Sequence, residues 1–109
     1  YCLHKLTGIV DKLLVYPDAM LHNMNRTGGL IYSQRILTAL VNKGILRQTA
    51  YVWVQRNAMK RWLEKEDFRT NIEKDADIAA HLTAQEIADC FDYKYFLRNV
   101  DTIFQRFAL

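Results

Sequence analysis

Histidine and serine are the residues through which proteins most often transfer protons, attack substrates or bind metals, and this chain has few of them. Its three histidines, His4, His22 and His81, lie far apart, without metal-ligand spacing and without a plausible nucleophile beside them. We interpret each as a surface or half-buried helix residue. Ser33 is the only serine. It falls inside a predicted helix, where a hydrogen bond to a backbone carbonyl or to another helix is favoured over nucleophilic attack.

Charged residues suggest structural roles of the same kind. Arg35 is expected to form a salt bridge, the alternative being contact with an anionic ligand at a subunit junction. No Asp/Glu pair stands out as a general acid and base, so Asp75 and Asp77 are interpreted as helix-end residues. The sequence therefore predicts no catalytic, cofactor-binding, substrate-binding or metal-ligating residue in this chain, and no cofactor.

The cysteines and paired glycines have equally plain interpretations. Cys2 and Cys90 lack disulfide or metal spacing, which favours small buried thiols in a reducing cytosol. Gly28 and Gly29 follow Thr27 without a phosphate-binding fingerprint around them, so we predict a tight turn between two helices.

Composition indicates a single all-α domain. The chain has 109 residues, of which 50% are hydrophobic and 25% charged, with only 4 Gly and 1 Pro. The net charge of +3 is a weak signal, because basic residues alternate with acids, as over 61–67, in the manner of a solvated helix face. Nucleic-acid binding is therefore disfavoured. No apolar run approaches the 18 or so residues of a membrane helix, so we expect no membrane partner and a cytoplasmic location.

Apolar spacing near 3.6 residues predicts the helices that must position these side chains. Helices are expected over 1–15, 17–26, 30–43, 47–65, 68–74 and 78–82, then after a capping box at Thr83–Glu86, and finally after a cap at Asp92. Gly44 is expected to end the third helix in a Schellman motif that places Ile45 against Leu40. The expected packing residues are Met20, Leu21, Met24, Leu30, Leu37, Leu40, Val41, Ala50, Tyr51, Val54, Ala58 and Trp62, with Phe96, Leu97, Val100, Ile103, Phe104 and Phe107 closing a small core.

The opening helix carries a seam for other helices. Leu3, Leu6, Val10 and Leu13 repeat at intervals of 3, 4 and 3, the a/d spacing of helices that pack along one another. Gly8 is expected to allow a neighbouring helix to approach closely. Because such a seam needs partners, we expect these residues to be a C-terminal piece of a longer polypeptide.

Several segments, in this order, resemble the C-terminal domain of the adenylosuccinate lyase family, within the fumarase/aspartase superfamily. They are Gly-Gly-Leu-Ile-Tyr-Ser-Gln-Arg at 28–35, Asn-Lys-Gly at 42–44 with Arg47 and Ala50-Tyr51, Val-Gln-Arg-Asn-Ala-Met at 54–59, Phe-Asp at 91–92 and Val-Asp-Thr-Ile-Phe-Gln-Arg at 100–106. Two departures concern local stability: Leu46 stands where a small polar cap is common, and Tyr93 where a proline is common.

The resemblance implies that 1–15 end a long helix of a central bundle and that 16–109 form a compact helical C-terminal domain. It implies a β-elimination that releases fumarate, from adenylosuccinate to give AMP and from the succinylocarboxamide ribotide (SAICAR) to give AICAR, in purine biosynthesis. Family members are homotetramers that use a serine on a flexible signature loop as general base and a histidine as general acid. Both motifs are absent here. The chain is therefore expected to be a scaffold, inactive alone, that depends on upstream domains where the purine nucleotide binds.

Two alternatives remain open at this stage. One is the C-terminal domain of a related superfamily enzyme of the carboxymuconate cycloisomerase type. The other is a non-enzymatic helical interaction module, for which the positive charge suggests nucleic acid as a partner.

Overall fold

A computed structural model describes residues 1–107, which are helical with no strand in that range, so the all-α prediction is confirmed. The elements are α1 (Cys2–Asp11), α2 (Pro17–Asn25), the 3-10 turn η1 (Leu30–Tyr32), α3 (Ser33–Asn42), α4 (Arg47–Glu64), α5 (Phe68–Lys74), α6 (Ala76–Ala79), α7 (Ala84–Cys90), α8 (Lys94–Leu97) and α9 (Val100–Gln105).

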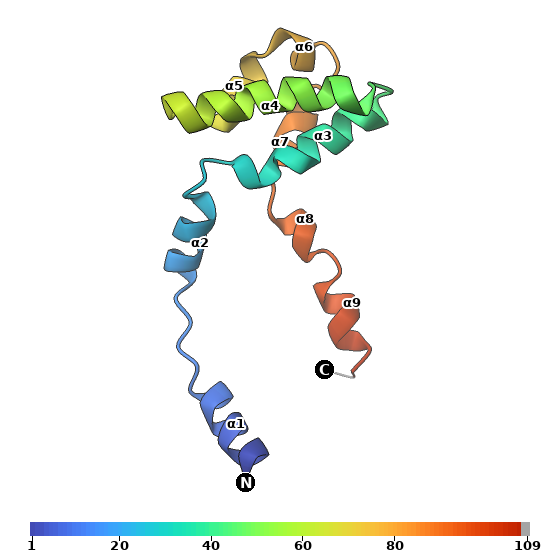
Figure 1. Cartoon of the computed structure of the whole chain (residues 1–109). Coiled ribbons are helices and arrows are strands. Elements are labelled where there is room, and N and C mark those ends of the chain that lie inside the picture. Colours follow the sequence, from blue (N-terminus) through green and yellow to red (C-terminus); the bar gives the residue numbers. More distant parts are fainter. Residues whose placement is uncertain (108–109) are drawn as a thin grey trace.

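The molecule consists of a helical body and two arms (Figure 1). Helices α3 to α7 pack into the body, which we define as residues 29–92. The N-terminal arm, α1 and α2, and the C-terminal arm, α8 and α9, both extend from the same side of it (Figure 1). The principal dimensions of 59 × 32 × 23 Å reflect this elongated arrangement.

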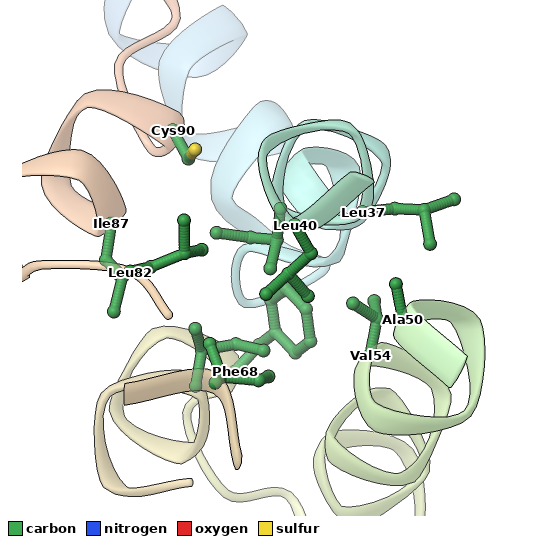
Figure 2. Close-up of a cluster of buried hydrophobic side chains, with 11 residues drawn as sticks. Leu37, Leu40, Ala50, Val54, Phe68, Leu82, Ile87 and Cys90 are labelled. Atoms are coloured by element: carbon green, nitrogen blue, oxygen red, sulfur yellow. The ribbon is translucent and has the colours of Figure 1, made fainter. Parts of the chain in front are cut away.

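The core lies where α3 and α4 pack against each other and against the shorter helices. Figure 2 shows Phe68 between these elements, with Leu37 and Val54 toward one side and Leu82 and Ile87 toward the other. The core residues are Ile36, Leu37, Leu40, Ala50, Val54, Phe68, Ile72, Ile78, Leu82, Ile87 and Cys90. This cluster draws on every body helix and so makes the body a single packed unit.

Local signals set several helix ends as predicted. Pro17 occupies the start of α2, where its missing N–H costs nothing. Gly44 adopts φ 91° and the Ile45 N–H donates to the Leu40 carbonyl at 3.2 Å, which confirms the Schellman ending of α3. The capping box of α7 is also confirmed: the Glu86 N–H donates to Thr83 Oγ1 at 3.2 Å, and the Thr83 N–H donates to Glu86 Oε2 at 2.9 Å.

Three predicted helix boundaries were wrong. The first helix ends at Asp11 rather than near residue 15. Pro17 disfavours helical backbone at the preceding Tyr16, which lies at φ −115° and ψ 81°, and no packed neighbour holds the intervening turn in a helix. The helix predicted over 78–82 begins earlier, because Asp75 caps α6. The final helix divides into α8 and α9, separated at Arg98 and Asn99.

The final segment does not close the core, contrary to prediction. Its apolar residues, including Phe96 and Phe104, lie on the exposed C-terminal arm, and Phe68 occupies the core instead. On α4, Tyr51 and Trp62 are exposed, whereas Asn57 is buried. These predictions failed because helical periodicity identifies an apolar face without showing which apolar face finds a partner within this chain.

Other expected packing positions had mixed outcomes. On α3, Leu37 and Leu40 are buried as predicted, and Ile36, which was not predicted, is fully buried beside them. On the N-terminal arm, Met20 and Leu21 are exposed. A Cβ added at Gly8 would meet no atom of the described chain within 4 Å, so no neighbouring helix approaches it here.

Truncation of Phe68 tests the position of the core. We expect Phe68→Ala to lower the free energy of unfolding by about 3–5 kcal/mol, because it removes a fully buried ring and leaves a cavity. Urea denaturation followed by far-UV circular dichroism measures the change. Phe104→Ala, on the C-terminal arm, is the matched control with an expected loss below about 1 kcal/mol; equal losses from both variants would contradict this assignment of the core.

Candidate functional site

The residues best suited to chemistry are dispersed in the structure. His4 lies on α1 and His22 in the last turn of α2, both exposed. His81 follows α6 and stacks on Trp53, with ring centroids 5.8 Å apart. Ser33 begins α3, and the hydrogen bond expected from its hydroxyl is not formed among residues 1–107. The fold therefore brings none of the four into a catalytic arrangement within the described range.

The two cysteines differ in their surroundings. Cys90 is buried in the core, as predicted, and burial raises the pKa of its thiol above the ordinary 9.0. A raised pKa favours the unreactive thiol over the thiolate. Cys2 is exposed on the N-terminal arm, so the expectation that both thiols are buried was wrong for Cys2. Across residues 1–107, no three His, Cys, Asp or Glu side chains gather in a way that could hold a metal ion.

A network of polar groups joins α4 to the start of α6. Arg56 Nε donates to Asp75 Oδ2 at 2.8 Å, and Arg56 Nη2 donates to Asp77 Oδ2 at 2.6 Å. The buried Asn57 donates to the same Asp75 oxygen at 2.6 Å. Asp75 also accepts the backbone N–H groups of Asp77 and Ile78. Asp75 is thus a helix cap, as predicted, and also the centre of a charged network that the sequence did not reveal.

The network controls the protonation of Asp75. Burial by itself would raise the pKa of this carboxyl, but hydrogen bonds from Arg56, Asn57 and the Ile78 N–H outweigh burial and lower the pKa below 3.8. The two carboxylates raise the pKa of Arg56 in return. Asp75 and Arg56 are therefore both charged at neutral pH, so the network suits structural support better than proton transfer.

A polar hollow of about 400 Å³ opens beside this network. Its lining residues are Asn57, Lys60, Glu66, Asp67, Thr70, Asn71, Lys74 and Asp75. Two of these residues have a buried polar atom, Asn57 Oδ1 and Asn71 Nδ2, with no hydrogen-bond partner among residues 1–107. Thr70 Oγ1 in the lining donates to Asp67 Oδ2 at 3.0 Å, but the same carboxylate caps α5 by accepting the Thr70 N–H, so this contact indicates helix capping rather than catalysis.

The paired glycines form the turn that the sequence predicts. Gly28 and Gly29 have φ values of 60° and 88°, a left-handed backbone that other residues rarely adopt. A Cβ at Gly29 would lie 3.1 Å from the Phe91 ring. Arg61 secures the turn from α4, donating to the Thr27 carbonyl at 3.3 Å and to the Lys65 carbonyl at 2.8 Å. The turn is therefore a structural joint between the N-terminal arm and the body.

Arg35 connects α3 to the end of α7. Its Nη1 donates to the Asp89 carbonyl at 2.8 Å and to the Asp92 carbonyl at 3.3 Å. Its guanidinium lies 3.7 Å from the centroid of the Tyr95 ring. A salt bridge to Arg35 was expected, but none forms among the described residues; carbonyls and an aromatic ring take its place.

The arms carry the largest feature that suggests a partner. Their exposed large hydrophobic residues are Tyr1, Leu3, Leu6, Ile9, Val10, Leu13, Leu14, Val15, Tyr16, Met20 and Leu21 on the N-terminal arm, and Tyr93, Tyr95, Phe96, Leu97, Val100, Ile103, Phe104 and Phe107 on the C-terminal arm. Both sets lie on segments that extend from the same side of the body (Figure 1). Exposed apolar surface on this scale is typical of a protein interface.

None of these helices resembles a membrane span: within the described range, no helix combines the length and the apolar character needed to cross a bilayer.

Comparison with known proteins gives consistent matches. Residues 29–107 match the family described as "Adenylosuccinate lyase C-terminus". The chain is 51% identical over 109 residues to the adenylosuccinate lyase of Staphylococcus saprophyticus subsp. saprophyticus and 48% identical over 109 residues to that of Bacillus subtilis (strain 168). Each match covers 100% of this chain and 25% of the relative, so the chain spans about a quarter of these relatives' length.

The charge of Asp75 should be measurable through stability at neutral pH. We expect Asp75→Asn to lower the free energy of unfolding by about 1–3 kcal/mol, because Arg56 and Asn57 lose a charged acceptor while Asn still caps α6. Urea denaturation at pH 7 provides the measurement. Glu73→Gln is the control, since its exposed ion pair with Arg69 should contribute no more than about 0.5 kcal/mol. An Asp75→Asn effect no larger than the control would show that the network is energetically neutral.

Acid should weaken the body through two carboxyls. Asp75 has a lowered pKa in the folded state, so its contribution is present above pH 3.8 and is lost as pH falls through the lower folded value. Lys43 and the Thr83 N–H lower the pKa of Glu86 from 4.5 to about 2, which places its contribution in the window between those values. We expect urea denaturation midpoints to fall from pH 5 to pH 2, and to fall less in Asp75→Asn; identical pH profiles would contradict the role of Asp75.

Proposed function

Because this chain belongs to the adenylosuccinate lyase family, as its C-terminal region, we propose that it is the helical supporting domain of an adenylosuccinate lyase. The complete enzyme would cleave adenylosuccinate to AMP and fumarate, and SAICAR to AICAR and fumarate. Each reaction is a β-elimination, in which a base removes a proton from carbon and the C–N bond breaks as an acid protonates the departing nitrogen. The serine base and histidine acid implied by the family resemblance would lie outside this chain, together with the nucleotide site.

The two apolar arms are the observation on which this proposal depends. The body already has a closed core, yet apolar residues are exposed along both arms on one side of it (Figure 1). An apolar face without a partner in the same chain is stabilised when another surface covers it. The relatives are about four times as long as this chain, so their remaining three-quarters is the natural source of that surface.

We propose a division of labour within the chain. Residues 1–15 end a long helix of a central bundle, although α1 itself stops at Asp11 here. The a/d spacing of Leu3, Leu6, Val10 and Leu13 supports this role, because all four side chains are exposed and the first three lie on α1. Residues 16–109 form the C-terminal domain, whose last two residues lie outside the described range. A helical bundle of this kind would join subunits into a homotetramer.

The competing interpretations lack comparable support. Identities of 48–51% over the whole chain connect it to adenylosuccinate lyases rather than to an enzyme of the carboxymuconate cycloisomerase type. Arg56 of α4 is engaged in ion pairs with Asp75 and Asp77, which disfavours a role in a nucleic-acid surface. We place the enzyme in the cytoplasm, since free thiols at Cys2 and Cys90 suit a reducing compartment.

A chimera tests the proposed function. In it, this chain replaces the matching quarter of the Bacillus subtilis relative, to which it is 48% identical. We expect the chimera to release fumarate from adenylosuccinate, detected by ultraviolet absorbance, and the isolated chain to release none. Leu6→Glu with Val10→Glu should abolish the chimera's activity by charging the seam, whereas Lys5→Glu, on the same helix, should retain it. Activity of the isolated chain, or a chimera that folds without activity, would contradict the proposal.

Assembly of the isolated chain offers a second test. We expect it to associate, or to be partly unfolded over α1, because the exposed seam has no partner. Multi-angle light scattering and hydrogen exchange measure these properties. The Leu6→Glu, Val10→Glu double variant should shift the chain toward monomer. A monodisperse monomer of the unmodified chain with strongly protected amides in α1 would overturn this expectation.

A further inference from the structure

Arg35 of α3 contacts both sides of the junction between α7 and α8. We propose that Arg35 is a positioning residue: it sets the direction in which the C-terminal arm leaves the body, and so presents the arm's apolar residues to the rest of the lyase. The second half of this inference depends on the proposed function. The first half concerns this chain alone.

The backbone of Arg35 is fixed by the packing of α3. It belongs to α3, where its neighbours in the chain, Ile36 and Leu37, are buried in the core. The same helix packs against both α4 and α7. The guanidinium therefore extends from a rigid part of the body rather than from a loop, and a group it holds is fixed relative to the core.

The guanidinium of Arg35 bonds to the backbone on both sides of the end of α7. Nη1 bonds to the carbonyl of Asp89, in the last turn of α7, and to that of Asp92, beyond the helix end. The Asp89 carbonyl lies at the negative end of the α7 dipole, where a cation is favoured, and it also accepts the Asp92 N–H at 3.4 Å. Arg35 thus determines how the backbone turns between α7 and α8.

The same guanidinium holds the first turn of the arm through Tyr95. It lies 3.7 Å from the centroid of that ring, and the guanidinium of Arg98 lies 3.8 Å from the same centroid. The phenol ring thus contacts two cations, one from the body and one from the arm itself. Both contacts are attractive because the ring face is electron-rich.

Aromatic contacts extend this junction into the core. Phe68 lies 5.9 Å from Phe91, Phe91 lies 5.4 Å from Tyr32, and Tyr32 stacks on Phe96 at 6.4 Å, all between ring centroids. Phe96 meets Tyr95 edge-on at 5.7 Å. Contacts of this geometry are individually weak but directional. A continuous series of rings therefore leads from the centre of the body to the residue that Arg35 covers.

Beyond this junction, the described residues of the C-terminal arm pack little against the body. Val100, Ile103 and Phe104 on α9 are exposed, and α9 lies away from the body (Figure 1). The direction of the arm is therefore decided at 91–98. Lysine would not replace Arg35, because a single ammonium lacks the planar group that bonds to carbonyls along its edge while stacking on a ring.

Hydrogen exchange of the 109-residue chain tests the positioning role. We expect Arg35→Ala, and to a similar degree Arg35→Lys, to accelerate amide exchange over 94–105 by about tenfold, with little change in α4 and α5. Tyr95→Ala should have a similar effect, whereas Tyr95→Phe, which keeps the ring, should not. Arg69→Ala is the matched control: this arginine lies 5.7 Å from the Phe91 ring but bonds to Glu73 within α5. Unchanged exchange over 94–105 in Arg35→Ala, or equal acceleration throughout the body, would overturn the proposal.

The chimera with the Bacillus subtilis relative tests the functional half. We expect Arg35→Ala in the chimera to raise the concentration needed for assembly by about tenfold, with the rate per assembled site retained once assembly is complete. Sedimentation velocity and fumarate release at matched concentrations measure both quantities. Unchanged assembly, or a rate that stays low in fully assembled protein, would overturn the positioning role. An unmodified chimera that assembles without activity would instead overturn the proposed function and leave the exchange result standing.

Discussion

A small apolar core, buried between α3, α4 and the short helices α5 to α7, holds the body together and fixes the positions from which its polar contacts form. Few side chains are fully buried, and the largest of them is Phe68. A core of this size provides limited stability, because small domains bury a smaller share of their surface than large ones. Apart from α4, the helices around it are short, and they persist because packing rather than intrinsic helicity stabilises them. The core in turn fixes the backbone of α3 and α4, from which the side chains of Arg35 and Asn57 form their hydrogen bonds.

Polar contacts at the edge of the core connect further elements of the body. Asp75 satisfies the first N–H groups of α6 and holds Arg56 and Asn57 of α4, so one carboxylate joins two elements that the core only partly connects. Glu86 closes the capping box of α7 and pairs with Lys43 at the end of α3. Removing one partner from such a network leaves a buried polar group unsatisfied, which costs more than the bond contributes. These polar contacts therefore help to fix how the body helices are arranged, although the core is small.

The separation of body from arms fits the supporting role proposed for this chain. The body folds around its own core, and the arms expose apolar residues on one side of it (Figure 1). We infer that the chain supplies packing surface and geometry, while chemistry belongs to the remaining three-quarters of a polypeptide as long as its relatives. Arg35 has a special place in that scheme because it joins the two parts: one side chain bonds to the end of α7 and stacks on the arm.

Local patterns along the chain were enough to predict the all-α class and the helix ends that depend on near neighbours. The Schellman motif at Gly44 and the Thr83–Glu86 capping box each join residues at most five positions apart, so the spacing of nearby residues is enough to predict them. Tertiary structure alone decided that Phe68 is buried while Phe104 is exposed, and that Arg35 meets a carbonyl 54 residues away. Periodicity shows that a face is apolar but not what covers it, and a charged side chain gives no sign of a distant partner. Long-range pairing emerges only when the helices pack, which is why the local features were predictable and the contacts between distant segments were not.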